Sequence, residues 1–324
     1  MKKNIYLITG SAGFIGYHLA KFLLLKKNIV IGIDNIKGFY DNKIKFDRIK
    51  ILKKYKNFKF YKKDVADIDI FLSQNEKKNI KVIFHLAAQP GVRLSEKYSD
   101  DYLSRNLISY LRILHFTSKN KIPYFFYASS SSVYGNTKDQ KESFYGESKS
   151  YYGLTKLINE KIAFDYSNYF TKTKYIGLRF FTVYGPFGRP DMAIYKMTSD
   201  ILSNKKITLF NKGLNSRDFT YIDDLIFLIF NIYKKRNLIK TNHIIFNTGL
   251  GTSYKTFEML KLIEKYLNKK AKIDYGNNSL DVIKTQSNFS KLKGFLKLNK
   301  LTKTSLDNGI KLFIEWYKIY HKVN

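Results

Sequence analysis

Short apolar runs alternate with longer amphipathic stretches along the first half of the chain. Runs rich in β-branched and aromatic residues predict strands, and apolar residues at helical spacing predict helices between them. The predicted strands are 4–9, 29–33, 58–62, 82–85 and 124–128, and the clearest helices are 14–26 and 102–119. Strands that alternate with helices predict a parallel, doubly wound sheet, so the expected fold class is α/β.

The first predicted strand runs directly into a glycine-rich turn. Gly10, Gly13 and Gly16 follow it in the pattern G-x-x-G-x-x-G, and the helix 14–26 begins inside the turn. Glycine at these places permits a sharp turn, close approach of the backbone to a pyrophosphate, and tight packing of the helix on the strand. The helix N-terminus also presents free N–H groups to phosphate. The pattern predicts a dinucleotide site, although three glycines alone also fit a turn without a ligand.

An acidic residue ends the second predicted strand. Asp34 lies 24 residues after Gly10 and is followed by Asn35. A carboxylate in this place can accept hydrogen bonds from both ribose hydroxyls of adenosine and would repel a 2′-phosphate. Behind the glycine turn, Asp34 therefore favours NAD over NADP. The alternative is an aspartate that only caps the turn.

The later predicted strands end in small and polar residues. Ligands of doubly wound sheets bind at the carboxyl ends of the strands. Asp64 and Val65 follow the third strand, and the small residues in 86–88 would let a cofactor pass close to the backbone. Four serines, 129–132, end the fifth strand, where a hydroxyl can bind a substrate oxygen. A serine-rich loop without a ligand is the alternative.

Tyr152 and Lys156 form the candidate acid/base pair. At i and i+4 they share a helix face, and the lysine charge is expected to lower the pKa of the tyrosine toward that of a general base. The spacing alone is weak evidence, because Tyr-x-x-x-Lys occurs at five other places in this chain. Position selects Tyr152, because it begins a long helix, has Ser150 as a possible N-cap, and directly follows the serine-rich strand end.

Composition narrows the classes of function. The chain has no cysteine, which excludes disulfides, zinc-thiolate sites and thiol nucleophiles. It has no apolar run of about 18 residues and no signal-peptide core before the first strand, so we expect a cytoplasmic protein with no membrane partner. The formal net charge of +32 is compatible with nucleic-acid binding. Because lysine is spread over the whole length, we favour codon bias as its origin and expect no nucleic-acid partner.

These motifs together resemble the extended short-chain dehydrogenase/reductase family of NAD-dependent nucleotide-sugar enzymes, and most closely its UDP-glucuronate 4-epimerases. The resemblance spans roughly 4–320, and its most specific block is 177–193. The other blocks are 9–16, 32–35, 85–93, 127–138 and 217–224. The resemblance implies bound NAD, a UDP-sugar substrate, and a homodimer formed through the helix that carries Tyr152 and the helix before it.

The resemblance also implies a mechanism. Tyr152 as a phenolate takes the proton of the sugar 4-hydroxyl, aided by Ser130, while hydride moves from C4 to NAD. Lys156 holds the nicotinamide ribose and tunes Tyr152. The 4-keto sugar then turns over in the site and hydride returns to its other face. The net result is inversion at C4 without net redox chemistry.

Binding residues are assigned by the same resemblance. For NAD it implies Gly10, Gly13, Phe14, Ile15, Gly16, Asp34, Asn35, Asp64, Val65, Leu86, Ala87, Ala88, Asn106, Tyr152, Lys156 and Phe180. For the substrate it implies Arg93, Ser131, Ser132, Thr182, Arg189, Phe210, Arg217 and Asp281.

Several of these substrate residues have a specific expected contact. Thr182 and Arg189 would contact the sugar, plausibly its carboxylate, and Arg217 would contact the UDP phosphates. Phe210 would lie near uracil, and Asp281 near the uridine ribose. An ion pair between Arg217 and the following aspartate at the start of a helix is the alternative for Arg217.

Ser131 and Ser132 distinguish the expected reaction from those of related enzymes. The related 4,6-dehydratases have Asp-Glu at these two positions, and UDP-glucuronate decarboxylases have Glu at the second. Two serines cannot supply an acid/base pair, and an uncharged pocket suits a uronate carboxylate. We therefore expect conversion of UDP-glucuronate to UDP-galacturonate. The open alternatives are 4-epimerisation of UDP-galactose, of a UDP-N-acetylhexosamine or of its uronate, decarboxylation of UDP-glucuronate, a regulatory NAD-binding protein, and a basic nucleic-acid-binding protein.

Two segments depart from the family pattern. The loop between Gly135 and Tyr152 is a few residues short, and 278–288 differs from the usual motifs. The resemblance also implies two interleaved domains. We expect a Rossmann-type NAD-binding domain of 1–180 plus about 218–250, and a smaller UDP-sugar-binding domain of about 181–217 plus 251–324.

Overall fold

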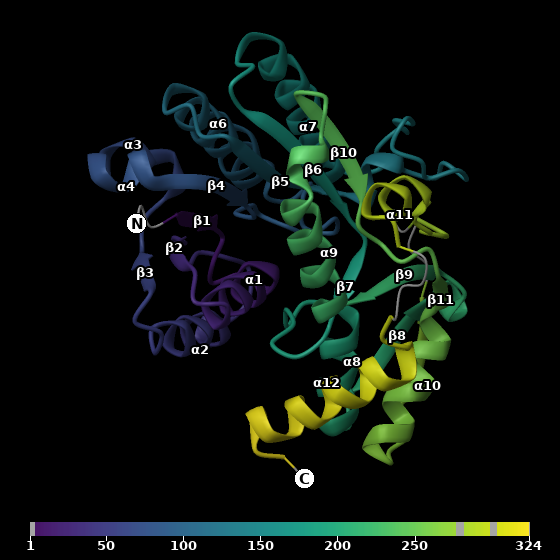
Figure 1. Cartoon of the computed structure of the whole chain (residues 1–324). Helices are drawn as coiled ribbons and strands as arrows, with labels where there is room; N and C mark the ends of the chain where they lie inside the picture. Colours follow the sequence, from purple (N-terminus) through teal and green to yellow (C-terminus); the bar gives the residue numbers. More distant parts are fainter. Residues whose placement is uncertain (1–3, 277–281, 299–302, 324) are drawn as a thin grey trace.

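A seven-stranded parallel sheet forms the centre of the computed structural model, which describes residues 4–276, 282–298 and 303–323 (Figure 1). The strand order is β10-β6-β5-β4-β1-β2-β3, and it reverses direction between β1 and β4. The predicted α/β class and the doubly wound sheet are confirmed. The strands are β1 (Ile5–Thr9), β2 (Ile29–Ile33), β3 (Phe58–Tyr61), β4 (Ile80–His85), β5 (Tyr124–Ser130), β6 (Lys174–Phe180) and β10 (His243–Asn247).

Helices cover both faces of this sheet because its strands are apolar on both sides. Successive side chains of a strand point to opposite faces, so Val82 and Phe84 belong to one hydrophobic cluster and Ile83 to another. The first cluster includes residues of α1 (Phe14–Leu25), α2 (Lys43–Leu52) and α9 (Ile222–Lys234). The second includes residues of α3 (Ile68–Phe71), α6 (Ser109–Lys119) and α7 (Tyr151–Tyr169).

Two predicted elements differ from those observed. The fifth strand was expected to end at 128, but β5 continues through Ser129 and Ser130, so these two serines lie on the strand itself. The predicted helix 102–119 consists of α5 (Ser99–Tyr102), a π-helical segment (Leu103–Ile108) and α6. Such π-helical segments often occur at functional sites.

The remaining elements gather at one end of the sheet, where Figure 1 shows α8, α10 and α12 together. A three-stranded sheet has the order β11-β9-β7, and β8 pairs in parallel with β12. The strands are β7 (Thr182–Tyr184), β8 (Lys206–Phe210), β9 (Ser216–Tyr221), β11 (Ser253–Lys255) and β12 (Lys272–Gly276). The helices of this part are α8 (Ala193–Leu202), α10 (Thr256–Leu267), α11 (Ser290–Leu296) and α12 (Leu306–His321). The short helix α4 (Gln74–Asn79) lies apart from them, beside α3 (Figure 1).

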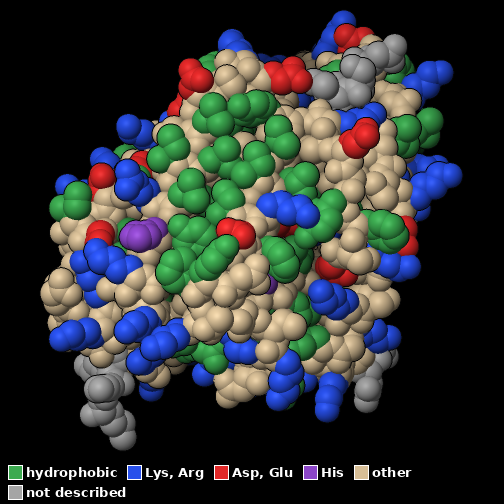
Figure 2. All heavy atoms as spheres, turned by 90° about the horizontal axis from the view of Figure 1, so that it is seen from above, with side chains coloured by type: hydrophobic (Ala, Val, Ile, Leu, Met, Phe, Trp, Pro, Cys, Tyr) green, Lys and Arg blue, Asp and Glu red, His purple; other side chains and the backbone are tan. Residues whose placement is uncertain are grey.

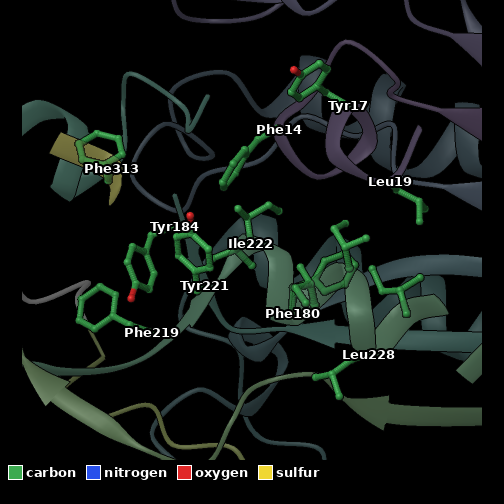
Figure 3. Close-up of a cluster of buried hydrophobic side chains, with 14 of the residues drawn as sticks. Phe14, Tyr17, Leu19, Phe180, Tyr184, Phe219, Tyr221, Ile222, Leu228 and Phe313 are labelled. Carbon is green, nitrogen blue, oxygen red and sulfur yellow. The ribbon is translucent and has the colours of Figure 1, made fainter. Parts of the chain in front are cut away.

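One continuous hydrophobic cluster joins this end of the molecule to the large sheet. In Figure 3, Phe14 of α1 points toward Ile222 at the start of α9. Tyr184 and Phe219 of the small sheet and Phe313 of α12 belong to the same cluster. The division into two interleaved domains and their boundaries stay a prediction.

The surface carries its positive charge in many places. Figure 2 shows Lys and Arg side chains distributed around one face with Asp and Glu among them, while hydrophobic side chains gather toward its middle. Among the residues that the structure describes, no helix has the length and apolar character needed to cross a membrane.

Candidate active site

A pocket lies at the carboxyl ends of the central strands, next to the point where the strand order reverses. Ligands of doubly wound sheets bind at this point. The predicted residues that line it are Gly10, Gly13, Phe14, Ile15, Gly16, Asp34, Asn35, Asp64, Val65, Leu86, Ala87, Ala88, Ser130, Tyr152, Lys156, Phe180 and Arg189. Segments up to about 180 residues apart in sequence are thus brought to one site.

The glycine turn has the geometry that a bound pyrophosphate requires. Gly10 has φ 71°, and a Cβ on Gly16 would lie 2.1 Å from the Gly10 carbonyl oxygen. Gly13 is the N-cap of α1 and supplies no side-chain hydrogen bond to the helix. The first N–H groups of α1 are therefore available to a phosphate, as the fit of a dinucleotide demands.

Asp34 is both a pocket residue and the residue that shapes the following turn. Its carboxylate accepts hydrogen bonds from the N–H groups of Ala12 at 3.0 Å and Ile36 at 2.8 Å. Ile36 has φ 60°, a conformation that β-branched residues rarely adopt, and its bond to Asp34 stabilises that turn. Burial raises the pKa of Asp34, against the opposing charge of Lys45. The turn-capping role is therefore present, and the choice of NAD over NADP by Asp34 stays a prediction.

Asn35 and Asp64 form the neighbouring wall of the pocket. The Asn35 side-chain amide donates to the Asp64 carboxylate at 2.7 Å, and the second oxygen of Asp64 accepts from the Ala66 N–H at 3.0 Å. Three lysines that the sequence analysis did not select, Lys37, Lys45 and Lys63, also line this part of the pocket. Lysine is so frequent in the chain that no sequence signal distinguished them.

Ser130 and Tyr152 lie together at the centre of the pocket. Tyr152 is in the first turn of α7, and the Ser150 hydroxyl caps this helix by accepting from the Gly153 N–H at 3.0 Å. Ser130 is the last residue of β5, and its hydroxyl opposes the rise in the pKa of Tyr152. The predicted N-cap Ser150 is confirmed, and the catalytic roles of Ser130 and Tyr152 stay a prediction.

The predicted lowering of the Tyr152 pKa is wrong, because this pKa is raised. Burial raises the pKa of Tyr152, and the groups that oppose this rise are Ser130 and Arg189. The Lys156 ammonium donates to the Ala128 carbonyl at 3.0 Å and lies 5.9 Å from the centre of the Tyr152 ring. Burial lowers the pKa of Lys156 itself to about 8. Desolvation by the surrounding strands thus outweighs the attraction expected from helical spacing.

A buried ion pair behind the strand end was missed in the sequence. Glu160 and Arg179 are both fully buried, and the guanidinium donates to the carboxylate at 2.9 and 2.7 Å. Ser129 donates a further hydrogen bond to Glu160. Glu160 follows Lys156 by one helical turn and opposes the lowering of its pKa. The sequence shows this i, i+4 relationship of Glu160 to Lys156, but no spacing indicates Arg179 as the partner of Glu160.

Arg189 stands between the main pocket and a smaller hollow. The hollow is also lined by Thr182, so the two residues predicted to contact the sugar share one wall. The Arg189 guanidinium forms a two-point ion pair with Asp191, with 3.0 Å between Nε and one carboxylate oxygen. The preceding residues 185–188 form a tight loop in which Phe187 has φ 56°. A non-glycine residue in this region costs about 1–2 kcal/mol, so the loop is held by its neighbours.

Four predicted residues lie near this site without lining the main pocket. Asn106 is fully buried and bonds the Gln89 backbone and the Thr155 hydroxyl, so it supports the wall of the pocket, and its contact with NAD stays a prediction. Ser131 and Ser132 are half-buried in the turn after β5, and the Ser132 hydroxyl lies 3.1 Å from that of Ser130. Thr182 lines only the smaller hollow described above.

The other residues predicted to bind the substrate do not line the main pocket. The Arg93 guanidinium lies over the Phe210 ring at 4.7 Å, which joins two of them. Arg217 is in the strand β9, so the alternative that placed it at the start of a helix is wrong. The carboxylate of the next residue, Asp218, accepts backbone N–H groups of 250, 251 and 287. Asp281 is outside the described residues.

The two segments that depart from the family pattern contact each other. The side chain of Gln140, in the short loop before α7, accepts from the Gln286 N–H at 3.0 Å and donates to the Lys284 carbonyl at 3.2 Å. Glu142 in the same loop accepts from the Asn247 N–H at 2.8 Å. The short loop is therefore fastened to the altered C-terminal segment and to the end of β10.

Comparison with known proteins places this geometry among NAD-dependent sugar enzymes. The profile of the NAD dependent epimerase/dehydratase family matches residues 6–249. An uncharacterized protein of Methanocaldococcus jannaschii is 40% identical over 322 residues, which are 98% of this chain and 97% of that protein. The UDP-glucuronate 4-epimerase of Thermodesulfobacterium geofontis is 33% identical over 326 residues, 97% of this chain and 96% of that protein.

A solved structure shares the whole fold. It is a Tyr-to-Phe variant of Bacillus cereus UDP-glucuronic acid 4-epimerase in complex with UDP-4-deoxy-4-fluoro-glucuronic acid and NAD. It superposes with a TM-score of 0.89 and 32% sequence identity, covering 98% of this chain and 99% of that one. The likeness therefore includes both the large sheet and the elements at its end.

Proposed function

Because the chain belongs to the NAD dependent epimerase/dehydratase family, we propose that it interconverts UDP-glucuronate and UDP-galacturonate through a 4-keto sugar. It is an isomerase, an NAD-dependent UDP-sugar 4-epimerase. The observation that carries the proposed sugar is the placement of Ser130, Tyr152 and Arg189 around one pocket. The Arg189 guanidinium is near enough to Tyr152 to affect its pKa. A uronate substrate requires such a cation for its carboxylate.

The residues of the pocket perform the proton chemistry. NAD bound along the glycine turn would supply the oxidant for the hydrogen on C4. Tyr152 removes the proton of the 4-hydroxyl and later returns it, and Ser130 holds the sugar oxygen close to the phenol. Because burial raises the pKa of Tyr152, nearby positive charge must stabilise the phenolate. Arg189 provides part of it, and Lys156 is the buried cation on the same helix as Tyr152.

A uronate fits the charge of the sugar end. The 4-keto form of a uronate is a β-keto acid and tends to lose CO2, so an epimerase must hold the carboxylate in a geometry that disfavours this loss. Arg189 and Thr182 share one wall, and the turn after β5 carries neutral Ser131 and Ser132. These groups can hold a carboxylate without like-charge repulsion.

We also propose that the protein works as a homodimer. The face of α7 that packs against the sheet carries Lys156, Asn159 and Glu160, whereas Leu154 and Phe164 are 43% and 55% exposed. On α6, Leu111 is 38% exposed. A second copy would cover these apolar side chains. Light scattering of the protein and of Phe164→Lys tests this, and a monomeric parent protein would contradict it.

Product analysis tests the proposed substrate. The purified protein is incubated separately with UDP-glucuronate, UDP-glucose and UDP-N-acetylglucosamine, and the products are resolved by chromatography. We expect UDP-galacturonate as the main product. A UDP-pentose as the main product from UDP-glucuronate would overturn the proposal. A cytoplasmic location and the absence of a nucleic-acid partner stay predictions.

A further inference from the structure

A fully buried arginine lies outside the residues assigned so far. Arg48 is on α2 and is 0% exposed. Its guanidinium donates to the Ala12 carbonyl at 2.7 Å, to the Phe187 carbonyl at 2.6 Å and to the Gly188 carbonyl at 3.3 Å. A buried charge that is bonded to backbone carbonyls holds those carbonyls in place strongly, because charge-assisted hydrogen bonds are the strong ones.

The segments that Arg48 joins belong to two different parts of the site. Ala12 is inside the glycine turn, and its N–H group donates to Asp34. Phe187 and Gly188 directly precede Arg189. One guanidinium thus connects the turn proposed to hold the NAD pyrophosphate with the loop that carries the arginine proposed to hold the sugar.

The loop that Arg48 contacts has little freedom of its own. Phe187 is in the left-handed region, with φ 56°. Its ring packs against Tyr17 of α1 and Trp316 of α12, each with ring centres 5.1 Å apart. His18 Nε2 lies 2.9 Å from the Pro186 carbonyl oxygen. Arg48 is therefore one of several contacts to this loop, and the one that bonds the glycine turn as well.

We propose that Arg48 is a positioning residue that couples the glycine turn to Arg189. By holding the Ala12 and Phe187 carbonyls together, it sets the place of Arg189 relative to a cofactor bound along the turn. The rigid fork of a guanidinium can donate in two directions at once, which a single ammonium group cannot do with the same geometry. The ligand of Arg189 in this inference, a uronate carboxylate, rests on the proposed function.

A double-mutant cycle tests whether Arg48 acts through Arg189. The background is Tyr152→Phe, which permits binding to be measured by calorimetry without turnover. Dissociation constants for UDP-glucuronate and for UDP are compared in Arg48→Met, Arg189→Met and the double variant. We expect Arg48→Met to weaken the binding of UDP-glucuronate about tenfold and the binding of UDP less than about twofold. In the double variant, Arg48→Met should add less than about threefold to the loss of UDP-glucuronate binding that Arg189→Met causes alone.

Equal losses for UDP and UDP-glucuronate, or losses that multiply in the double variant, would overturn the coupling and leave Arg48 an ordinary core residue. If Arg48→Met does not fold, Arg48→Lys, which keeps the charge, replaces it in the same double-mutant cycle. We expect about a threefold loss for it. Glu76→Gln weakens a buried capping box that does not line the pocket. It controls for general destabilisation and should leave both constants unchanged. Turnover of UDP-glucuronate by the enzyme with Tyr152 intact reports on the proposed function separately.

Discussion

The Arg189 guanidinium is paired at two points with the carboxylate of Asp191, two residues farther along the chain, at the edge of the pocket that contains the Tyr152 phenol. Contact at two points sets the direction of the guanidinium plane. The Arg189 side chain is mostly buried, whereas the Asp191 side chain is 38% exposed. A substrate carboxylate would meet an arginine whose orientation is already determined.

Loss of the Asp191 charge should therefore affect binding more than stability. For Asp191→Asn we expect the KM for UDP-glucuronate to rise about three- to tenfold, and the free energy of unfolding to change by less than about 1 kcal/mol. Steady-state kinetics and urea unfolding measure the two effects. Asp69→Asn, which removes a similarly exposed partner of Lys77 and Lys119, should leave KM unchanged. An unchanged KM in Asp191→Asn would show that the pair does not orient Arg189 for substrate.

Removal of the Tyr152 hydroxyl should abolish proton transfer and spare binding. General acid/base catalysis contributes about 10²–10⁴-fold to rate, so kcat of Tyr152→Phe should fall by that amount while the affinity for UDP-glucuronate stays within about threefold. Tyr151→Phe, at the neighbouring half-buried tyrosine, is the matched control and should keep its kcat. A Tyr152→Phe enzyme with most of its activity would remove Tyr152 from the mechanism.

The pH dependence of kcat should report the protonation of the buried Lys156. Burial lowers the pKa of Lys156 to about 8, and Glu160 opposes that lowering. Because the cationic form of Lys156 is the one that stabilises a phenolate, kcat should fall as pH rises through about 8. In Glu160→Gln the pKa of Lys156 falls further, so this descending limb should move to lower pH. A limb that stays in place would show that Glu160 does not set the charge of Lys156.

The same Glu160→Gln variant should be strongly destabilised. It leaves the fully buried guanidinium of Arg179 without its carboxylate, and breaking a buried pair costs about 3–5 kcal/mol. Replacement of both partners, as in Glu160→Gln with Arg179→Met, should recover part of this loss. Urea unfolding of the three proteins provides the comparison, and equal stability of the single and double variants would contradict it.

The charge of the turn after β5 should determine tolerance of a uronate. The Ser132 hydroxyl lies 3.1 Å from the Ser130 hydroxyl, so a carboxylate at 132 would lie close to the sugar. For Ser132→Glu we expect the KM for UDP-glucuronate to rise about tenfold or more, because like charges oppose each other at close range. Ser132→Gln has the same size without the charge and should retain a KM near that of the parent. Equal KM values in the two variants would argue against a carboxylate bound there.

Much of the pocket was predictable because its residues follow local patterns. A glycine turn, an aspartate at a strand end and a tyrosine after an N-capping serine can each be recognised from a few neighbouring residues. The end of β5 was misplaced because Ser129 and Ser130 do not continue an apolar run, although pairing with β6 extends β5 through them.

What was missed depends on contacts between distant residues. Arg48 donates hydrogen bonds to carbonyls 36 and 139 residues away. Arg179 of β6 forms an ion pair with Glu160 of α7. No spacing in the sequence indicates such pairs in a chain with 58 Lys and Arg residues. The error in the pKa of Tyr152 has the same origin, because helical spacing places Lys156 nearby but says nothing of the burial that raises that pKa.

The central claim is that the hydrogen on C4 of UDP-glucuronate leaves and returns within one active site. The most direct measurement uses UDP-glucuronate labelled with deuterium at C4 and follows the product by NMR. The account predicts UDP-galacturonate that retains the deuterium at C4. A UDP-galacturonate with solvent hydrogen at C4, or a UDP-pentose in its place, would contradict it.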